Sequence, residues 1–204
     1  MFVLTVDRRA STGHPDRVPG LLSHLGDLLD TLPGVVVAFD RTVGDEVQAV
    51  LDDPATVLDV VLDLLRDGGW SVGVGIGTVD EPLPTVSREA SGDAFVRARD
   101  AVEQAKSRTA TAPVAVRGGG QGGAARAAEA EALLRLLAAV AARRTAHGWQ
   151  AVDTLARVGG TQKDVARELG ISEQAVSQRL RSALWPEEAA VRPVVERLLG
   201  EADA

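Results

Sequence analysis

The stretch TQKDVARELGISEQAVSQRLRSAL, residues 161–184, decides the architecture of the C-terminal part of the chain. Gly170 separates two segments with helical spacing of apolar residues, and glycine readily adopts the left-handed backbone of a tight turn. Thr161 and Ser172 stand where the N-cap of each helix is expected, and Ile171 is placed to fill the corner between them. The pattern predicts a helix-turn-helix.

The second helix of this motif carries polar residues at the positions that do not face its core. A DNA-recognition helix needs such residues, since Gln pairs with adenine, Arg with guanine, and Ser with a base or a phosphate. The alternative is a helical hairpin that only packs and leaves its polar face in solvent. We expect base contacts from Gln174, Ser177, Gln178 and Arg181, and phosphate contacts from Lys163 and Arg179.

Helical patterns flank the motif on both sides. Residues 149–158 are expected to form a supporting helix, and residues 187–199 to close a trihelical core through Val191, Val194, Val195 and Leu198. Residues 124–144 are rich in Ala, Leu and Glu, which favour helix. This helix either pairs with its copy in a homodimer, which would match a two-fold symmetric operator, or packs within its own domain.

Five glycines within residues 118–123 mark the clearest boundary in the chain. Because glycine loses the most backbone entropy on ordering, a flexible linker is expected there. The segment would separate an N-terminal domain, residues 1–117, from a helical DNA-binding domain, residues 124–204.

The N-terminal domain alternates between strand and helix patterns in the order βαββαβαβ. This order predicts an α+β, ferredoxin-like fold, with helices on one face of a mostly antiparallel sheet. The alternating glycines Gly73, Gly75 and Gly77 lie in a strand, where they allow close helix packing or leave room for a ligand. The strands are expected near residues 2–6, 34–39, 47–51, 70–79 and 112–116, and the helices near 18–32, 55–65 and 93–107.

Composition narrows the class of protein. The chain of 204 residues has no cysteine, which excludes disulfides and thiolate metal sites, and its three histidines are too scattered to predict zinc. No apolar run has the length of a membrane helix, and no signal-peptide pattern precedes the first strand, so we expect a cytoplasmic protein. The net charge is −7, and the excess of acidic residues lies entirely before residue 124. Any DNA-binding face must therefore come from local segregation of charge.

Three carboxylates form a candidate metal site in the N-terminal domain. Asp7 ends the first predicted strand, and Asp45 and Glu46 lie in the following hairpin. These places are neighbours if the first strand is central in the sheet, and oxygen ligands suit Mg²⁺ with a bound nucleotide. Alternatively, Asp45 is a turn residue, Glu46 an edge charge, and Asp7 a cap of the next loop.

This arrangement resembles the palm-like domain of class III nucleotide cyclases and GGDEF diguanylate cyclases. In those families the matching carboxylates hold metal and triphosphate. Val43 and Val47 depart from the GGDEF pattern, which implies a degenerate domain without catalytic residues that binds a nucleotide or dimerises. The candidates for gripping phosphate are Arg8, Arg9, Lys106 and Arg108.

The chain is similar to the SatD family along nearly its whole length. The resemblance rests on GDEVQAVL (44–51), VGVGIGTV (72–79), SGDAFVRARDAVEQAK (91–106) and AVSQRL (175–180). It implies a cytoplasmic bacterial protein in which a cyclase-like domain is joined to a DNA-binding domain.

Three functions follow as hypotheses. The first is a transcriptional regulator that binds double-stranded DNA as a homodimer, with an N-terminal module that senses a nucleotide or dimerises. The second is a Mg²⁺-dependent enzyme of the nucleotidyl cyclase type. The third is a protein-interaction adaptor whose helices pack without DNA.

Overall fold

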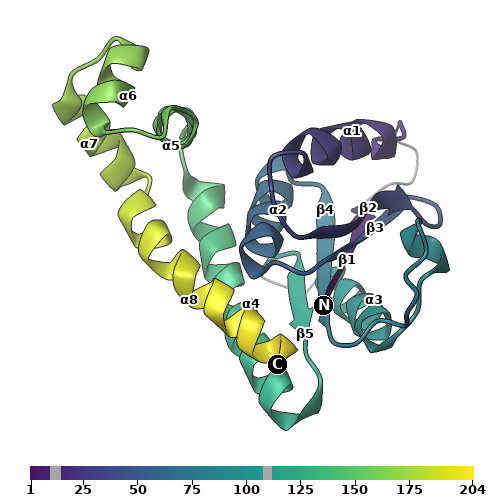
Figure 1. Cartoon of the computed structure of the whole chain (residues 1–204). Helices are drawn as coiled ribbons and strands as arrows, with labels where there is room; N and C mark the ends of the chain where they lie inside the picture. The colour runs from purple at the N-terminus through teal and green to yellow at the C-terminus, as the bar shows by residue number, and fades with distance from the viewer. Residues whose placement is uncertain (10–14, 108–111) are drawn as a thin grey trace.

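The computed structural model of the chain describes residues 1–9, 15–107 and 112–204 (Figure 1). The strands are β1 (Phe2–Arg8), β2 (Val35–Arg41), β3 (Glu46–Leu51), β4 (Trp70–Ile76) and β5 (Val114–Arg117). The helices are α1 (Val18–Leu29), α2 (Pro54–Asp67), α3 (Asp93–Ala105), α4 (Gly120–Arg143), α5 (Ala146–Val158), α6 (Gln162–Leu169), α7 (Glu173–Ser182) and α8 (Trp185–Asp203). A 3₁₀ turn, η1 (Ser87–Glu89), precedes α3.

The five strands form one sheet in the order β2-β3-β1-β4-β5. Strand β1 lies at the centre and pairs antiparallel with both β3 and β4, whereas β5 joins β4 in parallel. The α+β class, the element order up to β5 and the mostly antiparallel sheet are confirmed.

The helices cover both faces of the sheet, so the prediction of one covered face is wrong (Figure 1). Phe2, Leu4 and Val6 of β1 face α1 and α2, whereas Val3 faces α3. Helix α3 reaches its face because β4 has glycines there. A Cβ on Gly75 would lie 2.1 Å from the carbonyl oxygen of Ala94 in α3.

The glycine segment 118–123 is not an extended linker, because α4 begins at Gly120. Its glycines allow close packing instead. A Cβ on Gly118 would lie 2.4 Å from the oxygen of Gly123, and one on Gly123 would lie 2.9 Å from the oxygen of Ala202. The segment therefore allows the start of α4 to pack closely against the end of α8.

Helices α4 and α8 pack side by side against the sheet-bearing part of the chain (Figure 1). Leu134 and Leu137 of α4, with Leu198 and Leu199 of α8, belong to the same buried cluster as β1 and α2. The apolar stripe of α4 is thus buried within its own chain, with Leu136 left exposed. We call this unit, residues 1–143 and 185–204, the body.

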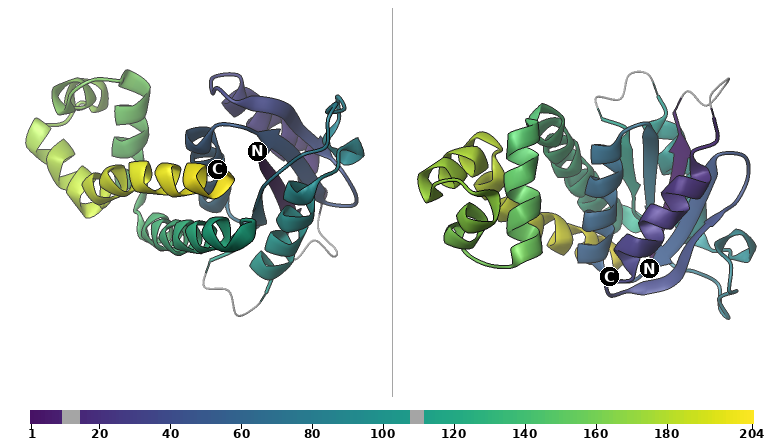
Figure 2. Two further views of the ribbon diagram at one scale, coloured as in Figure 1. Left: turned by 60° about the horizontal axis from the view of Figure 1, so that its bottom comes forward. Right: turned by 90° about the horizontal axis from the view of Figure 1, so that it is seen from above.

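Helices α5, α6 and α7 form a second unit, which we call the head (Figure 2). The expected supporting helix is present as α5. The expectation that residues 187–199 close the trihelical core is wrong, since α8 buries Val195 and Leu198 in the body and leaves Val194 exposed. Ala183 and Trp185 complete the core of the head instead.

Arg144, which lies between the two units, contacts both of them. The guanidinium of Arg144, at the end of α4, donates to the carbonyl oxygen of Ala183 at 3.0 Å and to Glu188 of α8 at 2.7 Å. It also stacks on the ring of Trp149 in α5, at 4.4 Å from the centroid. From the body, Arg66 stacks on the same ring at 3.9 Å. These contacts hold the head in a defined orientation.

Candidate DNA-binding interface

Helix α6 begins at a capping box. The carboxylate of Asp164 accepts hydrogen bonds from the backbone N–H and the hydroxyl of Thr161, both at 2.9 Å. The hydrogen bond from the backbone N–H of Thr161 is the largest cause that lowers the pKa of Asp164 below its ordinary value. The bond from the Thr161 hydroxyl and the nearby Arg167 lower it further. Because the box satisfies N–H groups that a helix start leaves open, it specifies where α6 begins.

A three-residue turn, Gly170 to Ser172, joins α6 to α7. Gly170 adopts the left-handed conformation, with φ 64° and ψ 32°. The N–H of Ile171 then donates to the oxygen of Ala166 at 3.0 Å, and the hydroxyl of Ser172 accepts from the N–H of Ala175 at 3.1 Å. Both helix ends are thereby satisfied by local sequence, as predicted.

A small apolar core holds α7 against α5 and α6. Its buried members are Ala151, Val152, Val165, Ala166, Val176, Leu180 and Ala183. Ala166 lies among them as a small side chain, which allows the helices to approach closely. This core fixes which face of α7 points outward.

The outward face of α7 carries the four residues predicted for base contacts. Gln174, Gln178 and Arg181 are exposed, and Ser177 is half-buried. Their spacing of three, four and seven residues places all four on one side of a helix. The structure therefore brings these side chains together on an accessible surface.

The two residues predicted for phosphate contacts lie beside this surface. Arg179 is half-buried and donates to the side-chain oxygen of Gln150 in α5 at 2.9 Å. It lines a hollow of about 290 Å³ with His147 at the start of α5. Lys163 is exposed on α6. Neither Lys163 nor Arg181 forms an ion pair within the described part of the chain.

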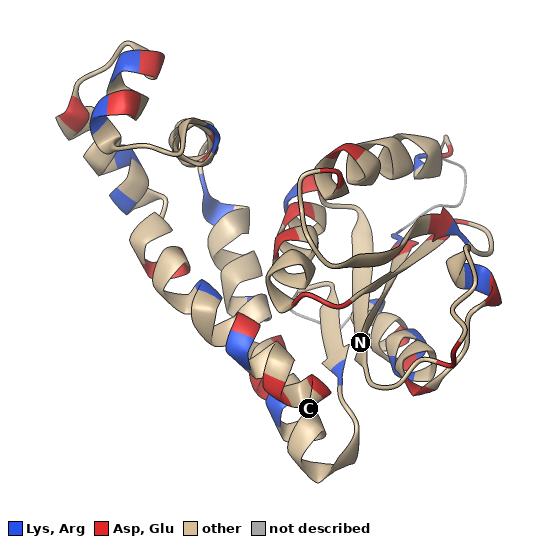
Figure 3. Ribbon diagram, in the orientation of Figure 1, with Lys and Arg blue, Asp and Glu red and all other residues tan. Residues whose placement is uncertain are grey.

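Charges of both signs are interspersed on the head (Figure 3). Arg157 pairs with Glu168 at 3.0 Å, and Arg167 with Asp164 at 2.9 Å. These exposed pairs partly neutralise two cations on the surface of the head. The remaining positive charge near α7 comes from Lys163, Arg179 and Arg181. This local segregation of charge is what residues 124–204, which are neutral overall, require for a DNA-binding face.

The three N-terminal carboxylates do not converge on one point. Asp7 and Glu46 are register partners on β1 and β3, but each of the three side chains has its own partner. Lys106 pairs with Asp7 at 2.7 Å, Arg41 contacts Asp45 at 3.3 Å, and the hydroxyl of Thr42 donates to Glu46 at 2.6 Å.

Among the residues that the structure describes, no group of three His, Cys, Asp or Glu could hold a metal ion. As arranged, these carboxylates do not form the oxygen cage that Mg²⁺ prefers. A Mg²⁺–nucleotide site there stays a prediction.

Three of the four predicted phosphate-gripping residues lie together. Arg8, Arg9 and Lys106 line an open pocket of about 580 Å³ with Gly69 and Ser71, whereas Arg108 lies outside the described residues. Burial alone would lower the pKa of Lys106, but its hydrogen bonds to Asp7 and Glu103 outweigh this and raise the pKa. The ammonium group of Lys106 is therefore charged and already paired with the carboxylates of Asp7 and Glu103.

The sequence analysis missed a pocket beside α3, lined by Thr42, Glu46, Gln48, Phe95 and Arg99 among others. These residues come from the β2–β3 hairpin, β3 and α3. No local spacing signals their proximity, because the sheet register and the packing of α3 bring them together.

Comparisons with known proteins leave the family open. No family model and no curated protein matches the chain. Among solved structures, a regulator of polyketide synthase expression from Bifidobacterium adolescentis aligns with 100% of this chain and 81% of its own. The identity is 15% and the TM-score 0.28, a level at which the likeness carries no argument. Within the described residues, no helix combines the length and apolar character of a membrane span.

Proposed function

We propose that this protein is a transcriptional regulator that binds double-stranded DNA through α7. The observation that carries the proposal is the exposed polar face of α7, held outward by the core it shares with α5 and α6. The caps and the glycine turn fix the angle between α6 and α7, as a helix-turn-helix requires.

In this proposal, α7 enters the major groove. Gln174 and Gln178 offer bidentate hydrogen bonds to adenine, Arg181 to guanine, and Ser177 to a base edge or a phosphate. Lys163 and Arg179 flank this face and neutralise phosphates. The body would then serve as the ligand-responsive or dimerising module, and two copies would meet the two half-sites of an operator.

The experiment uses the full chain and a pool of random duplexes from which bound sequences are selected at low salt. The selected duplex is then titrated with the wild type and with Gln178→Ala combined with Arg181→Ala. Because each bidentate base contact contributes about 1–3 kcal/mol of discrimination, we expect the double variant to weaken specific binding at least about 30-fold.

The matched control is Arg197→Ala, which removes an exposed arginine near the C-terminal end of α8. It changes the net charge by the same amount but lies away from α7, so binding should stay within about twofold of the wild type. Selection of no duplex, or equal binding by the double variant and the wild type, would contradict the proposal.

Salt dependence tests the phosphate contacts separately. If Lys163 neutralises one phosphate, Lys163→Ala should reduce the slope of log K against log salt by about 0.9 and weaken all sequences alike. An unchanged slope would remove Lys163 from the interface while leaving base contacts by α7 intact.

A further inference from the structure

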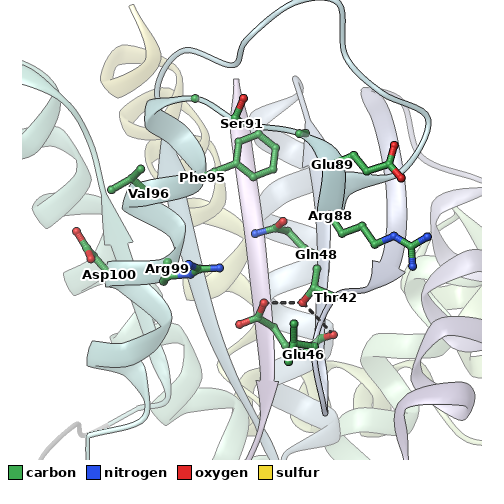
Figure 4. A pocket seen from close by; sticks show the side chains of 13 residues that line it. Thr42, Glu46, Gln48, Arg88, Glu89, Ser91, Phe95, Val96, Arg99 and Asp100 are labelled. Atoms are coloured by element: carbon green, nitrogen blue, oxygen red, sulfur yellow. Dashed lines mark hydrogen bonds between the residues drawn. The ribbon is translucent and has the colours of Figure 1, made fainter.

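An open pocket of about 640 Å³ lies between the β2–β3 hairpin, η1 and α3, on the side of the body that faces α3 (Figure 4). Its volume falls in the range of small-molecule sites. The head does not contribute to its lining. Any ligand bound there would therefore be recognised independently of the DNA-binding face.

The floor of the pocket is a fixed polar group. Gln48 of β3 is only 8% exposed, and its amide N–H donates to the hydroxyl of Thr5 at 2.9 Å. The hydroxyl of Ser87 donates to the backbone oxygen of Gln48 at 2.9 Å, which ties η1 to the sheet. The floor is therefore held in place before any ligand binds.

Five charged residues line this pocket, namely Glu46, Arg88, Glu89, Arg99 and Asp100. Two of them, Arg99 and Glu46, have opposite charges and approach it from opposite sides without forming an ion pair (Figure 4). Arg99 extends from α3 toward β3, where the carboxylate of Glu46 lies beside Thr42 (Figure 4). Within the described residues, Arg99 has no carboxylate within ion-pair distance and Glu46 has no cation. Elsewhere on the body such partners are found, as for Arg97 with Asp93 at 2.9 Å.

Apolar side chains also line this pocket. Phe95 of α3 is half-buried, and its ring faces the pocket (Figure 4). Val43 and Val96 line the same pocket and are the two most exposed large apolar residues described, at 79% and 63%. Exposed apolar side chains gathered at one pocket mark a binding surface more often than scattered ones do.

We propose that this pocket binds a small zwitterion of the α-amino acid class with an apolar side chain. Arg99 receives the ligand carboxylate, Glu46 receives the ammonium, and Phe95 and Val96 pack on the side chain. A simple anion would face the carboxylate of Glu46, and a simple cation would face Arg99. A ligand that carries both charges can pair with Arg99 and with Glu46 at the same time. This site goes beyond the proposed DNA binding and does not depend on it.

The test measures binding to the full chain by calorimetry, without DNA. L-phenylalanine is compared with phenethylamine, which lacks the carboxylate, and with 3-phenylpropionate, which lacks the ammonium. Each analogue leaves either Arg99 or Glu46 without a partner of opposite charge. We therefore expect phenylalanine to bind at least about tenfold more tightly than either analogue.

Two variants test which residue binds which charge of the ligand. Arg99→Ala should weaken phenylalanine binding about tenfold without weakening phenethylamine binding, because the variant removes a charge that repels the amine. Glu46→Gln should weaken phenylalanine binding without weakening 3-phenylpropionate binding, because it removes a charge that repels the carboxylate. The matched control is Arg88→Ala, because Arg88 lies at the rim and points away from the pocket (Figure 4). Thermal melting of each variant reports whether the fold is intact.

Several outcomes would overturn the proposal. The first is that no apolar amino acid binds at concentrations up to about 10 mM. The second is that all three compounds bind equally, and the third is that Arg99→Ala and Glu46→Gln bind phenylalanine like the wild type. Binding of guanosine that is lost in the same variants would assign the pocket to another ligand class. Because the assay contains no DNA, a failure here is separate from a failure of the DNA-binding proposal.

Discussion

At the scale of single residues, Asp164 shows how one side chain specifies a helix start. Its carboxylate satisfies the backbone of Thr161, so the ionised form favours the folded state and the pKa is lowered. The stabilisation from this group is present above the unfolded-state pKa, about 3.9, and is lost as pH falls through the lower folded-state pKa.

A carboxyl titration by carbon NMR checks this directly. The pKa of Asp164 should lie below that of an unstructured aspartate, and Thr161→Ala should move it back part of the way, since one of two hydrogen bonds remains. If Asp164 titrated at the ordinary value, the capping box would not form in solution.

Gly75 lies where α3 approaches the sheet closely. A Cβ there would meet backbone atoms of Ala94 and Ala98 at 2.1 and 2.2 Å, so α3 must move to accept a side chain. Gly75→Ala should therefore lower the free energy of unfolding by about 2–3 kcal/mol, measured by urea denaturation.

The control is Gly20→Ala in α1, where a Cβ meets nothing within 4 Å. Because alanine favours helix over glycine, this change should raise the free energy of unfolding by up to about 1 kcal/mol. Equal effects of the two substitutions would show that α3 does not pack on β4 as described.

At the scale of elements, the joint between α4, α7 and α8 depends on one buried charge pair. The side chain of Arg144 is fully buried and that of Glu188 is 8% exposed. Replacing the carboxylate by an amide leaves the buried guanidinium without a counter-charge and with only neutral carbonyl oxygens as acceptors, which is costly. We expect Glu188→Gln to lower the free energy of unfolding by about 3 kcal/mol.

Glu187→Gln is the matched control, because Glu187 is the exposed neighbour on the same helix. A surface charge contributes little, so its change should stay within about 0.5 kcal/mol. Similar losses in both variants would mean that the Arg144–Glu188 pair does not hold the joint.

The same elements show what sequence reasoning could predict. Residues 161–184 carry their own signals in Thr161, Gly170 and Ser172, so α6, the turn and α7 were predictable, together with the outward face of α7. Local spacing determines these features. A helix pattern does not say which surface buries it, and for that reason α8 was assigned to the wrong core.

The glycine segment is ambiguous in sequence for a related reason. Glycine is compatible with flexibility and with close packing, and only the tertiary contact of Gly123 with Ala202 distinguishes the two. The pocket beside α3 could not be predicted either, since Gln48 and Arg99 are brought together by the sheet and by Gly73 and Gly75.

At the scale of the whole molecule, the body is discontinuous in sequence and the head is an insertion within it. Helix α8 returns from the head to pack on α4 and α2, and its last turn lies beside the first residue, where Asp203 pairs with the N-terminal amino group (Figure 1). The head core is small by comparison, so it should open at lower free energy than the sheet.

This arrangement predicts the opposite outcome for two truncations. Residues 1–117 alone lack Leu134, Leu198 and Leu199, which cover one face of the body core. That fragment should show no cooperative thermal transition and should aggregate, because a large apolar surface is uncovered.

Replacing residues 146–182 with a short Gly-Ser loop removes the head but keeps α4 and α8. The ends to be joined lie within reach of a short loop, since the side chain of Arg144 contacts the oxygen of Ala183 at 3.0 Å. This variant should unfold cooperatively and keep any small-molecule binding, while it loses retention of DNA. If instead residues 1–117 unfolded cooperatively near the temperature of the full chain, the boundary would lie at residue 117. Helices α4 and α8 would then belong with the head, as their place in the sequence had implied.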